Sequence, residues 1–204
     1  MKIGILTYHF AINYGAVLQC YALQQYLTSL GHDVEVINFI PQNYSRKRFW
    51  QNNNLRHDFV NGMSKLFLKL KYSSEMRKSF SGFVSSRFNL SESVDYTNFS
   101  DALNKYDAVI TGSDQVWGPS RWDDLCYFFD HMHNYRGRKI SYAPCCAINK
   151  AKNILKRNEI AVLLSEFYSL SVRNMETYNF VFDLIGKNVP IVSDPTLLYE
   201  FNEL

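Results

Sequence analysis

The first 38 residues read as a strand, a helix and a second strand, and this pattern restricts the fold more than any other feature of the sequence. Ile3 to Thr7 is a short apolar run followed by a polar loop, which is typical of a buried strand. After Asn13, a possible N-cap, apolar residues recur every three or four positions as far as Gly31, which is typical of one helix face. Val34 to Asn38 is a second strand pattern. This unit predicts two parallel strands joined by a right-handed crossover.

The same alternation returns in the second half of the chain. Further strands are expected at residues 108–111, 139–143, 169–172 and 190–192, and helices at residues 99–106, 160–167 and 175–185. We therefore predict the α/β class, with a doubly wound, mostly parallel sheet and helices on both faces. The length of 204 residues fits one domain.

Residues 42–90 interrupt this rhythm. A helical stripe from Leu55 to Leu70 lies in a segment with few β-branched residues, and residues 46–87 hold ten basic and two acidic side chains. We predict a basic helical insertion that projects from the sheet as the most mobile part of the chain. A solvated helix face is the usual explanation for such a charge run. The alternatives are an anionic glycan, a membrane surface or nucleic acid, of which we do not expect nucleic acid.

The cysteine pattern and the hydropathy of the chain bear on its location. The four cysteines show neither zinc-ligand spacing nor a C-x-x-C motif, so we expect reduced thiols and a cytoplasmic protein. No apolar run is long enough to span a bilayer, and the start of the chain reads directly into a strand. His131 and His133 lie near Cys126 without a specific spacing, so we predict no metal site.

In open α/β sheets, ligands bind at the carboxyl ends of the strands, which directs attention to the loops there. Asn13, Tyr14 and Gly15 lie at the start of a predicted helix, where free N–H groups and the helix dipole suit an anion or a hydroxylated ligand. The alternative is that Asn13 only caps the helix. Neither G-x-G-x-x-G nor a Walker A sequence is present, which argues against a dinucleotide or a P-loop.

A second polar loop follows the strand at residues 108–111. Gly112, Ser113, Gln115 and Trp117 combine backbone freedom, hydrogen-bonding groups and an aromatic face, a mixture that suits a sugar, while Asp114 is the candidate general base. The alternative is a turn in which Asp114 accepts backbone N–H groups and Trp117 belongs to the core. We expect the two loops to surround one concave surface.

Arg173 ends the strand expected at residues 169–172. It is a candidate for binding phosphate or carboxylate, with a structural salt bridge as the equal alternative. The stretch Asp194 to Leu198 is interpreted as structural, because Pro195 ends the strand ladder.

Six stretches, taken in order, resemble the polysaccharide pyruvyl transferase family. They are Lys2 to Thr7, Asn13 to Gln24, Asp107 to Trp117, Ser141 to Pro144, Ser171 to Arg173 and Asp194 to Leu198. The third stretch, Asp107 to Trp117, is the most distinctive. The ordered set covers nearly all of the chain.

This resemblance implies two Rossmann-like domains that face one cleft, as in many glycosyltransferases, with this chain as the N-terminal, acceptor-side half. The implied activity is transfer of a pyruvyl group, as a ketal, from phosphoenolpyruvate to a sugar of a cell-surface glycan precursor, free or lipid-linked, with no metal or organic cofactor. Cys145-Cys146-Ala147 stands where the family usually has a small Ser-Phe-Gly-like turn.

The chain ends at Leu204, where the family's second domain should begin. That domain is expected to bind most of the phosphoenolpyruvate, so the 204-residue chain alone is predicted to be inactive. Two other hypotheses remain open: a sugar-nucleotide glycosyltransferase domain, and a non-catalytic relative that binds glycan or acts as a scaffold.

Overall fold

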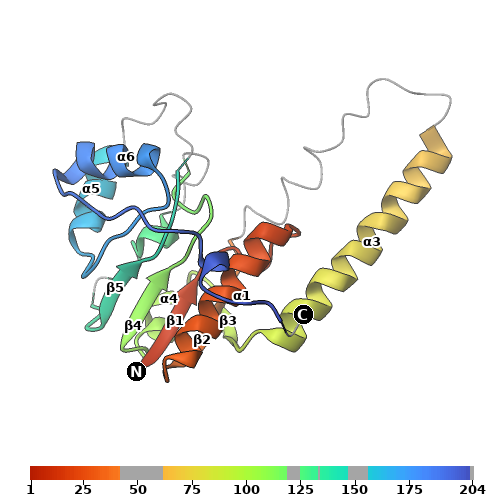
Figure 1. Ribbon diagram of the computed structural model, residues 1–204, viewed down its shortest axis with the longest axis horizontal. Helices are drawn as coiled ribbons and strands as arrows, with labels where there is room; N and C mark the ends of the chain where they lie inside the picture. The colour runs from red at the N-terminus through yellow and green to blue at the C-terminus, as the bar shows by residue number, and fades with distance from the viewer. Residues whose placement is uncertain (42–61, 119–124, 133, 147–155, 203–204) are drawn as a thin grey trace.

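The chain is built around a five-stranded sheet in which every strand pair is parallel. A computed structural model describes residues 1–41, 62–118, 125–132, 134–146 and 156–202. The strands are β1 (Lys2–Leu6), β2 (Asp33–Phe39), β3 (Leu90–Val94), β4 (Ala108–Thr111) and β5 (Arg138–Ser141). Their order across the sheet is β3-β2-β1-β4-β5 (Figure 1). The predicted α/β class with a parallel sheet is confirmed.

Helices cover both faces of this sheet. They are α1 (Tyr14–Ser29), α3 (Gly62–Arg87), α4 (Phe99–Leu103), α5 (Arg157–Ser165) and α6 (Met175–Ile185), with short 3-10 turns η2 (Cys126–Phe128) and η4 (Pro195–Leu197). On one face, Leu23 of α1 packs with Ile3 and Ile5 of β1. On the other, Leu6 belongs to the largest core cluster, together with Phe99 of α4.

The capping residues explain why α1 begins and ends where it does. The Asn13 side-chain oxygen accepts a hydrogen bond from the N–H of Ala16 at 3.1 Å, which satisfies one of the free donors of the first turn. Gly31, just past the last turn, has φ +83°, a conformation that glycine adopts without a steric penalty. Both roles were predicted and are confirmed.

The segment predicted as a separate insertion, residues 42–90, leads directly into a strand of the sheet. Leu90–Val94 forms β3, which was not predicted, and β3 pairs in parallel with β2. Helix α3 is therefore the crossover between two parallel strands, although it extends well away from the sheet (Figure 1). Residues 42–61 lie outside the described residues, and the mobility of this region stays a prediction.

The two strands predicted last in the chain reduce to single bridges. Ser169 forms one parallel bridge with Ile140, and Val172 forms one with Ile191. Side-chain hydrogen bonds replace part of the ladder here. The Ser141 hydroxyl donates to the carbonyl of Ser171 at 2.9 Å, and the Ser171 hydroxyl donates to the carbonyl of Ser141 at 2.8 Å. Serine side chains compete in this way with regular backbone pairing.

Candidate functional site

The loops after β1 and β4 meet at the carboxyl edge of the sheet. These strands are neighbours at the point where the strand order changes direction, which is where open α/β sheets bind ligands. The Thr7 hydroxyl donates to the carbonyl of Ser113 at 2.8 Å. A Cβ at Gly112 would lie 3.1 Å from the Cβ of Thr7, so glycine permits this close approach. The two loops predicted to converge are thus in direct contact.

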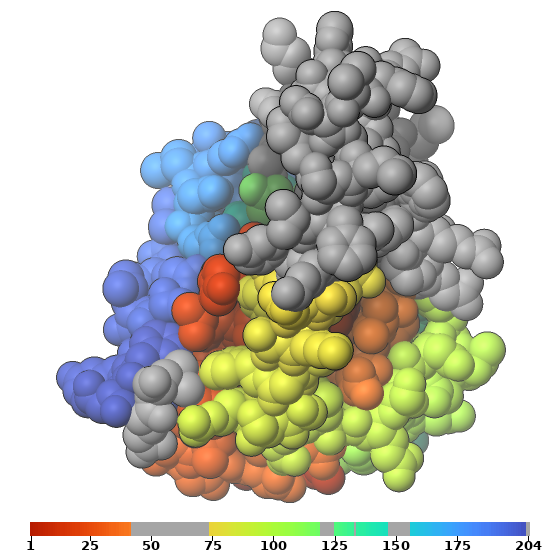
Figure 2. Space-filling view, turned by 90° about the vertical axis from the view of Figure 1, so that its right-hand side faces the viewer, coloured from red at the N-terminus to blue at the C-terminus, as the bar shows by residue number. Residues whose placement is uncertain are grey.

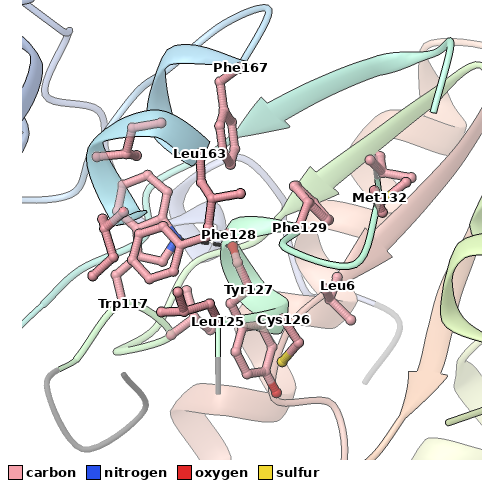
Figure 3. Packing of buried hydrophobic residues seen from close by; sticks show 14 of the residues in the cluster. Leu6, Trp117, Leu125, Cys126, Tyr127, Phe128, Phe129, Met132, Leu163 and Phe167 are labelled. Carbon is pink, nitrogen blue, oxygen red and sulfur yellow. Dashed lines mark hydrogen bonds between the residues drawn. The ribbon is translucent and has the colours of Figure 1, made fainter. Parts of the chain in front are cut away.

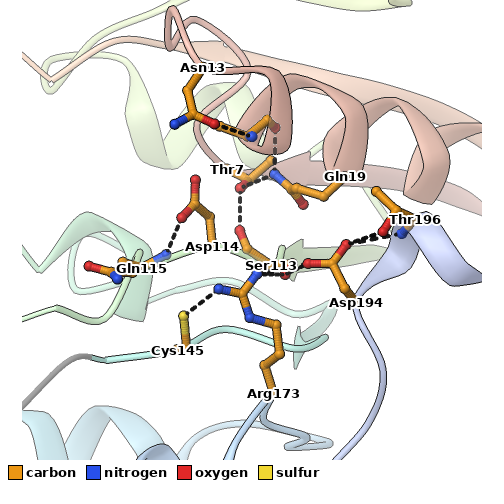
Figure 4. Close-up of polar contacts among 11 residues, drawn as sticks. Thr7, Asn13, Gln19, Ser113, Asp114, Gln115, Cys145, Arg173, Asp194 and Thr196 are labelled. Carbon is orange, nitrogen blue, oxygen red and sulfur yellow. Dashed lines mark hydrogen bonds and ion pairs between the residues drawn. The ribbon is translucent and has the colours of Figure 1, made fainter.

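Asn13, Tyr14 and Gly15 are exposed at the start of α1, on the same edge of the sheet. The Asn13 side-chain oxygen is engaged as the cap, which was one of the two interpretations of this residue. Figure 4 shows the Asn13 side chain on the side of the loop that carries Asp114. The start of α1 therefore faces the loop that follows β4.

Asp114 has a backbone conformation that is unfavourable for a side chain. Its φ is +91°, outside the regions that residues other than glycine readily adopt. Its carbonyl accepts a hydrogen bond from the N–H of Cys145 at 2.8 Å, and it forms an isolated parallel bridge with Pro144. The loops after β4 and β5 hold this conformation between them.

The Asp114 carboxylate is half-buried. Its Oδ1 accepts a hydrogen bond from the N–H of Gln115 at 2.7 Å. Within the described residues, Oδ2 has no hydrogen-bond partner. The carboxylate therefore combines one anchored oxygen with one that is available to accept a proton.

Arg173 joins three segments that are distant in the sequence (Figure 4). Its Nη1 donates to the Ser113 hydroxyl at 3.1 Å and to Oδ2 of Asp194 at 2.7 Å, and its Nη2 donates to the sulfur of Cys145 at 2.9 Å. The Ser113 hydroxyl also donates to Oδ2 of Asp194, at 3.1 Å. Arg173 is thus in an ion pair, and that ion pair lies within the predicted loop cluster.

The two titratable groups that contact Arg173 have pKa values shifted in opposite directions. Burial alone would raise the pKa of Asp194, but hydrogen bonds from Thr196 and Arg173 outweigh it and lower that pKa below its usual value. Burial is also the main influence on Cys145, where it outweighs the nearby guanidinium and raises the pKa of the thiol. Asp194 is therefore ionised at neutral pH, whereas Cys145 is a neutral thiol that accepts a hydrogen bond.

Trp117 corrects the prediction of an aromatic platform for a sugar. The residue is fully buried, with its ring stacked on Phe128 at 5.1 Å between centroids and an angle of 11° (Figure 3). Its Nε1 donates to the carbonyl of Tyr127 at 3.1 Å. An indole that already has an aromatic neighbour and a hydrogen-bond partner in the core offers no face to a ligand, so the core alternative holds for this residue.

Sequence reasoning missed several residues that build the site. Gln19 is buried and its Nε2 donates to Thr7 Oγ1 at 3.1 Å, which supports the loop after β1 from below. Asp194 was interpreted only as structural, and Cys145 only as a departure from a family pattern. The one signal in the sequence was Gln19, a polar residue between apolar neighbours in the helix, because buried polar side chains need partners.

Within the part of the chain that the structure describes, no group of three or more His, Cys, Asp or Glu side chains is placed to hold a metal ion. Across the same residues, every helix is too short or too polar to cross a membrane.

Comparison with known proteins assigns the chain to a family. No curated protein matches it. The sequence model for polysaccharide pyruvyl transferase matches residues 13–203, which include the whole of α1, β4 and the loop cluster around Arg173. Because this match covers nearly the whole chain, the protein belongs to the polysaccharide pyruvyl transferase family.

Proposed function

We propose that this chain is the acceptor-side domain of an enzyme that transfers a pyruvyl group from phosphoenolpyruvate to a sugar of a cell-surface glycan precursor. The observation that carries the proposal is the shared position of the Asp114 carboxylate and the Arg173 guanidinium in one loop cluster, connected through Ser113 and Cys145. Family membership supports the reaction class. In the complete architecture that we propose, a second Rossmann-like domain faces this cluster across a cleft.

The proposed reaction adds two hydroxyl groups of one sugar to C2 of phosphoenolpyruvate. The bond between C2 and the phosphate oxygen breaks, and C3 gains a proton and becomes a methyl group. One hydroxyl proton ends on that methyl carbon and the other on the released phosphate. A hydroxyl is a poor nucleophile unless a base takes its proton during attack, and we assign that role to Asp114. Its anchored Oδ1 orients the carboxylate, while Oδ2 receives the proton.

Arg173 is the proposed contact with the carboxylate or phosphate of the donor. A guanidinium has five N–H donors, and three of the hydrogen bonds that it can make go to Ser113, Asp194 and Cys145. In the described part of the chain, its Nε and the second N–H of Nη2 have no partner. Because Asp194 neutralises much of its charge, Arg173 alone is a weak anion site, and we assign most of the donor contacts to the second domain.

Acceptor binding is assigned to the groups that converge at the carboxyl edge of the sheet. Tyr14, Gly15 and Gln115 are exposed there, and so is Asn13, whose side chain lies on the side of the loop that carries Asp114 (Figure 4). Hydroxyl groups of a sugar suit such a mixture of amide, backbone and phenol groups. All four cysteines are free and buried, which supports the proposed location in the cytoplasm, where thiols stay reduced.

The test is phosphate release from phosphoenolpyruvate, measured with the full product of the reading frame that encodes this chain. We expect release that depends on an added glycan acceptor, together with an acceptor product of increased mass. Asp114→Asn should lower kcat by about 100-fold or more, the usual contribution of a general base. Asp101→Asn, an exposed carboxylate on α4, is the matched control and should leave kcat unchanged.

Two results would assign the site to another class. Consumption of a sugar nucleotide in place of phosphoenolpyruvate would make the protein a glycosyltransferase. Saturable glycan binding with no turnover of either donor would make it a binding or scaffolding relative.

A further inference from the structure

Helix α1 buries two glutamines, Gln19 and Gln24, whose amides have partners in different parts of the fold. Gln24 bonds the backbone that follows α3: its Nε2 donates to the carbonyl of Arg87 at 3.3 Å, and its Oε1 accepts from the N–H of Asn89 at 3.0 Å. Figure 2 shows the part of α3 drawn in yellow against the red and orange residues of the first part of the chain. Gln24 therefore joins α1 to the end of α3, which is not part of the candidate site.

The amide of Gln19 instead begins a chain of hydrogen bonds that ends at the candidate site (Figure 4). Its Nε2 donates to the carbonyl of Ala16 at 2.8 Å and to Oγ1 of Thr7 at 3.1 Å. The Thr7 hydroxyl in turn donates to the carbonyl of Ser113 at 2.8 Å. A carbonyl can only accept, so the two carbonyls at the ends of this chain fix the direction of every hydrogen bond between them. The proton of the Thr7 hydroxyl is thus directed to Ser113.

Ser113 connects this chain to the ion pair of the site. Its buried hydroxyl accepts from Nη1 of Arg173 at 3.1 Å and donates to Oδ2 of Asp194 at 3.1 Å. A guanidinium only donates and a carboxylate only accepts, so these two directions are fixed as well. A shift of the Ser113 backbone would move a hydroxyl that lies between two charged groups. The position of Arg173 therefore depends on the contact that Thr7 makes with the carbonyl of Ser113.

Stability alone does not account for a glutamine at position 19. The Oε1 atom of Gln19 is buried and has no hydrogen-bond partner among the described residues. A buried acceptor without a partner lowers stability, and an apolar side chain of similar length would avoid that loss. Local features that lower stability are typical of functional sites.

We propose that Gln19 and Thr7 are positioning residues of the candidate site, which hold Ser113, and through it Arg173, in the arrangement that binds the anionic group of the donor. Both side chains are almost fully buried, so they act through Ser113 and not by contact with a substrate. The inference rests on the proposed function for the reaction that this arrangement serves.

Replacement of Thr7 tests the central link of the chain in the full product of the reading frame. Thr7→Val keeps the size of the side chain and removes the hydroxyl. We expect it to lower kcat for phosphate release from phosphoenolpyruvate by about tenfold or more, because a small misplacement of binding groups is enough for such a loss. Thr7→Ser keeps the hydroxyl and should retain most of the kcat, although it loses a buried methyl group and therefore stability. An unchanged kcat in Thr7→Val would overturn the proposal.

The two buried glutamines of α1 provide a matched comparison. Gln19→Met should lower kcat by less than Thr7→Val does, because Thr7 keeps a hydroxyl that can still reach Ser113. Adding Gln19→Met to Thr7→Val should lower kcat no further, since contacts in one chain are not independent. Gln24→Met also removes a buried amide from α1, and it should lower stability in urea while kcat stays at the parent value. Equal losses of kcat in Gln19→Met and Gln24→Met would mean that both roles are structural and would overturn the proposal.

Thiol modification tests the same positions without any reaction. Cys145 is 3% exposed, and its sulfur accepts a hydrogen bond from Nη2 of Arg173. If Thr7→Val displaces Ser113 and Arg173, N-ethylmaleimide should modify Cys145 faster than in the parent, as measured by mass spectrometry, whereas Gln24→Met should leave the rate unchanged. The parent rate in Thr7→Val would overturn the proposal, even where turnover is lost. The expected change in a protein that does not consume phosphoenolpyruvate would support the positioning role and refute the proposed reaction.

Discussion

At the scale of single residues, the candidate site depends on one guanidinium that contacts three separate segments. Arg173 reaches Ser113 after β4, Cys145 after β5 and Asp194 near the end of the described chain. Arginine suits such a position because its planar group donates in several fixed directions at once. The geometry of the cluster therefore depends on the ion pair with Asp194 as much as on the loops themselves.

Replacing Asp194 with Asn should lower the free energy of unfolding by about 1–2 kcal/mol at neutral pH, because a charge-assisted hydrogen bond is lost between two partly exposed groups. The pKa of Asp194 is lower in the folded protein than the value of about 3.9 expected in the unfolded chain. The contribution of the Asp194 carboxylate to the free energy of unfolding is therefore complete above the pKa of the unfolded chain. It is lost as the pH falls through the pKa of the folded protein.

Urea unfolding at a series of pH values measures this effect. The difference between the parent and Asp194→Asn should be constant from neutral pH down to about pH 5, and should shrink below about pH 4. Asp183→Asn, at an exposed position on α6, is the control. A difference that grows as the pH falls would contradict the assignment.

Residue-scale contacts were the part of the site least accessible from sequence. Asp114, Ser113 and Arg173 were selected because each follows a predicted strand. The first two do follow β4, and Arg173 comes within hydrogen-bond distance of Ser113 although the segment before it forms only single bridges. The partner of Arg173 was not predictable, because Asp194 lies 21 residues away and reaches it through a segment without regular pairing. Trp117 was misassigned to the site because a tryptophan after a strand has the same local pattern whether it faces solvent or core.

At the scale of elements, local capping determined which helices were predicted with accurate ends. Helix α6 has the bounds expected from sequence, and both α1 and α6 begin after an asparagine whose side-chain oxygen accepts a backbone N–H. Strand β3 was missed because Ser91, Glu92 and Ser93 interrupt its apolar pattern. Edge strands have one unpaired side and tolerate such polar residues, so their sequences carry a weak signal.

The two asparagine caps offer a matched comparison. Asn13→Ala and Asn174→Ala should each lower the free energy of unfolding by about 1 kcal/mol, because each leaves a helical N–H without its acceptor. Asn13→Ser should retain most of the stability, since serine is also a good N-cap. Thermal unfolding of the three variants checks this, and an unchanged stability in Asn13→Ala would show that the hydrogen bond at α1 contributes nothing.

Two glycines in regular elements should respond oppositely to alanine. A Cβ at Gly82 in α3 meets no atom within 4 Å, so Gly82→Ala should raise the free energy of unfolding by up to about 1 kcal/mol through helix propensity. A Cβ at Gly4 in β1 would lie 2.9 Å from side-chain carbons of Ile37 and Tyr106. Gly4→Ala should therefore lower the free energy of unfolding by about 1–3 kcal/mol. Denaturant titration of both variants measures the two signs, and a stable Gly4→Ala would mean that the sheet face is more loosely packed than described.

At the scale of the whole molecule, the last described segment connects the site to α3. From Asp194 the chain passes η4, which packs on α1, and then places Tyr199 and Phe201 in the cluster formed by α1 and the end of α3. The ring of Tyr199 lies 5.8 Å from that of Tyr21, and Figure 1 shows this end of the chain beside the end of α3. The segment therefore makes α3 part of the same cooperative unit as the sheet.

Tyr199→Ala tests this connection. We expect a loss of about 1–3 kcal/mol in the free energy of unfolding, because a partly buried ring leaves an aromatic cluster. Circular dichroism and tryptophan fluorescence should still report one coincident transition. Leu197→Ala, at a position 77% exposed, is the control and should change stability by less than about 0.5 kcal/mol.

The positive φ of Asp114 has a consequence for how variants of this protein would be selected. A backbone held at φ +91° disfavours every side chain and accommodates glycine. The fold is therefore less stable with aspartate at position 114 than it would be with glycine. A library screened only for heat resistance would be enriched in glycine at position 114, and the carboxylate assigned here as the base would disappear from it. A library screened for turnover would keep aspartate and its strain. The two screens would diverge at this one codon, which makes it a marker of which property a population of variants has been selected for.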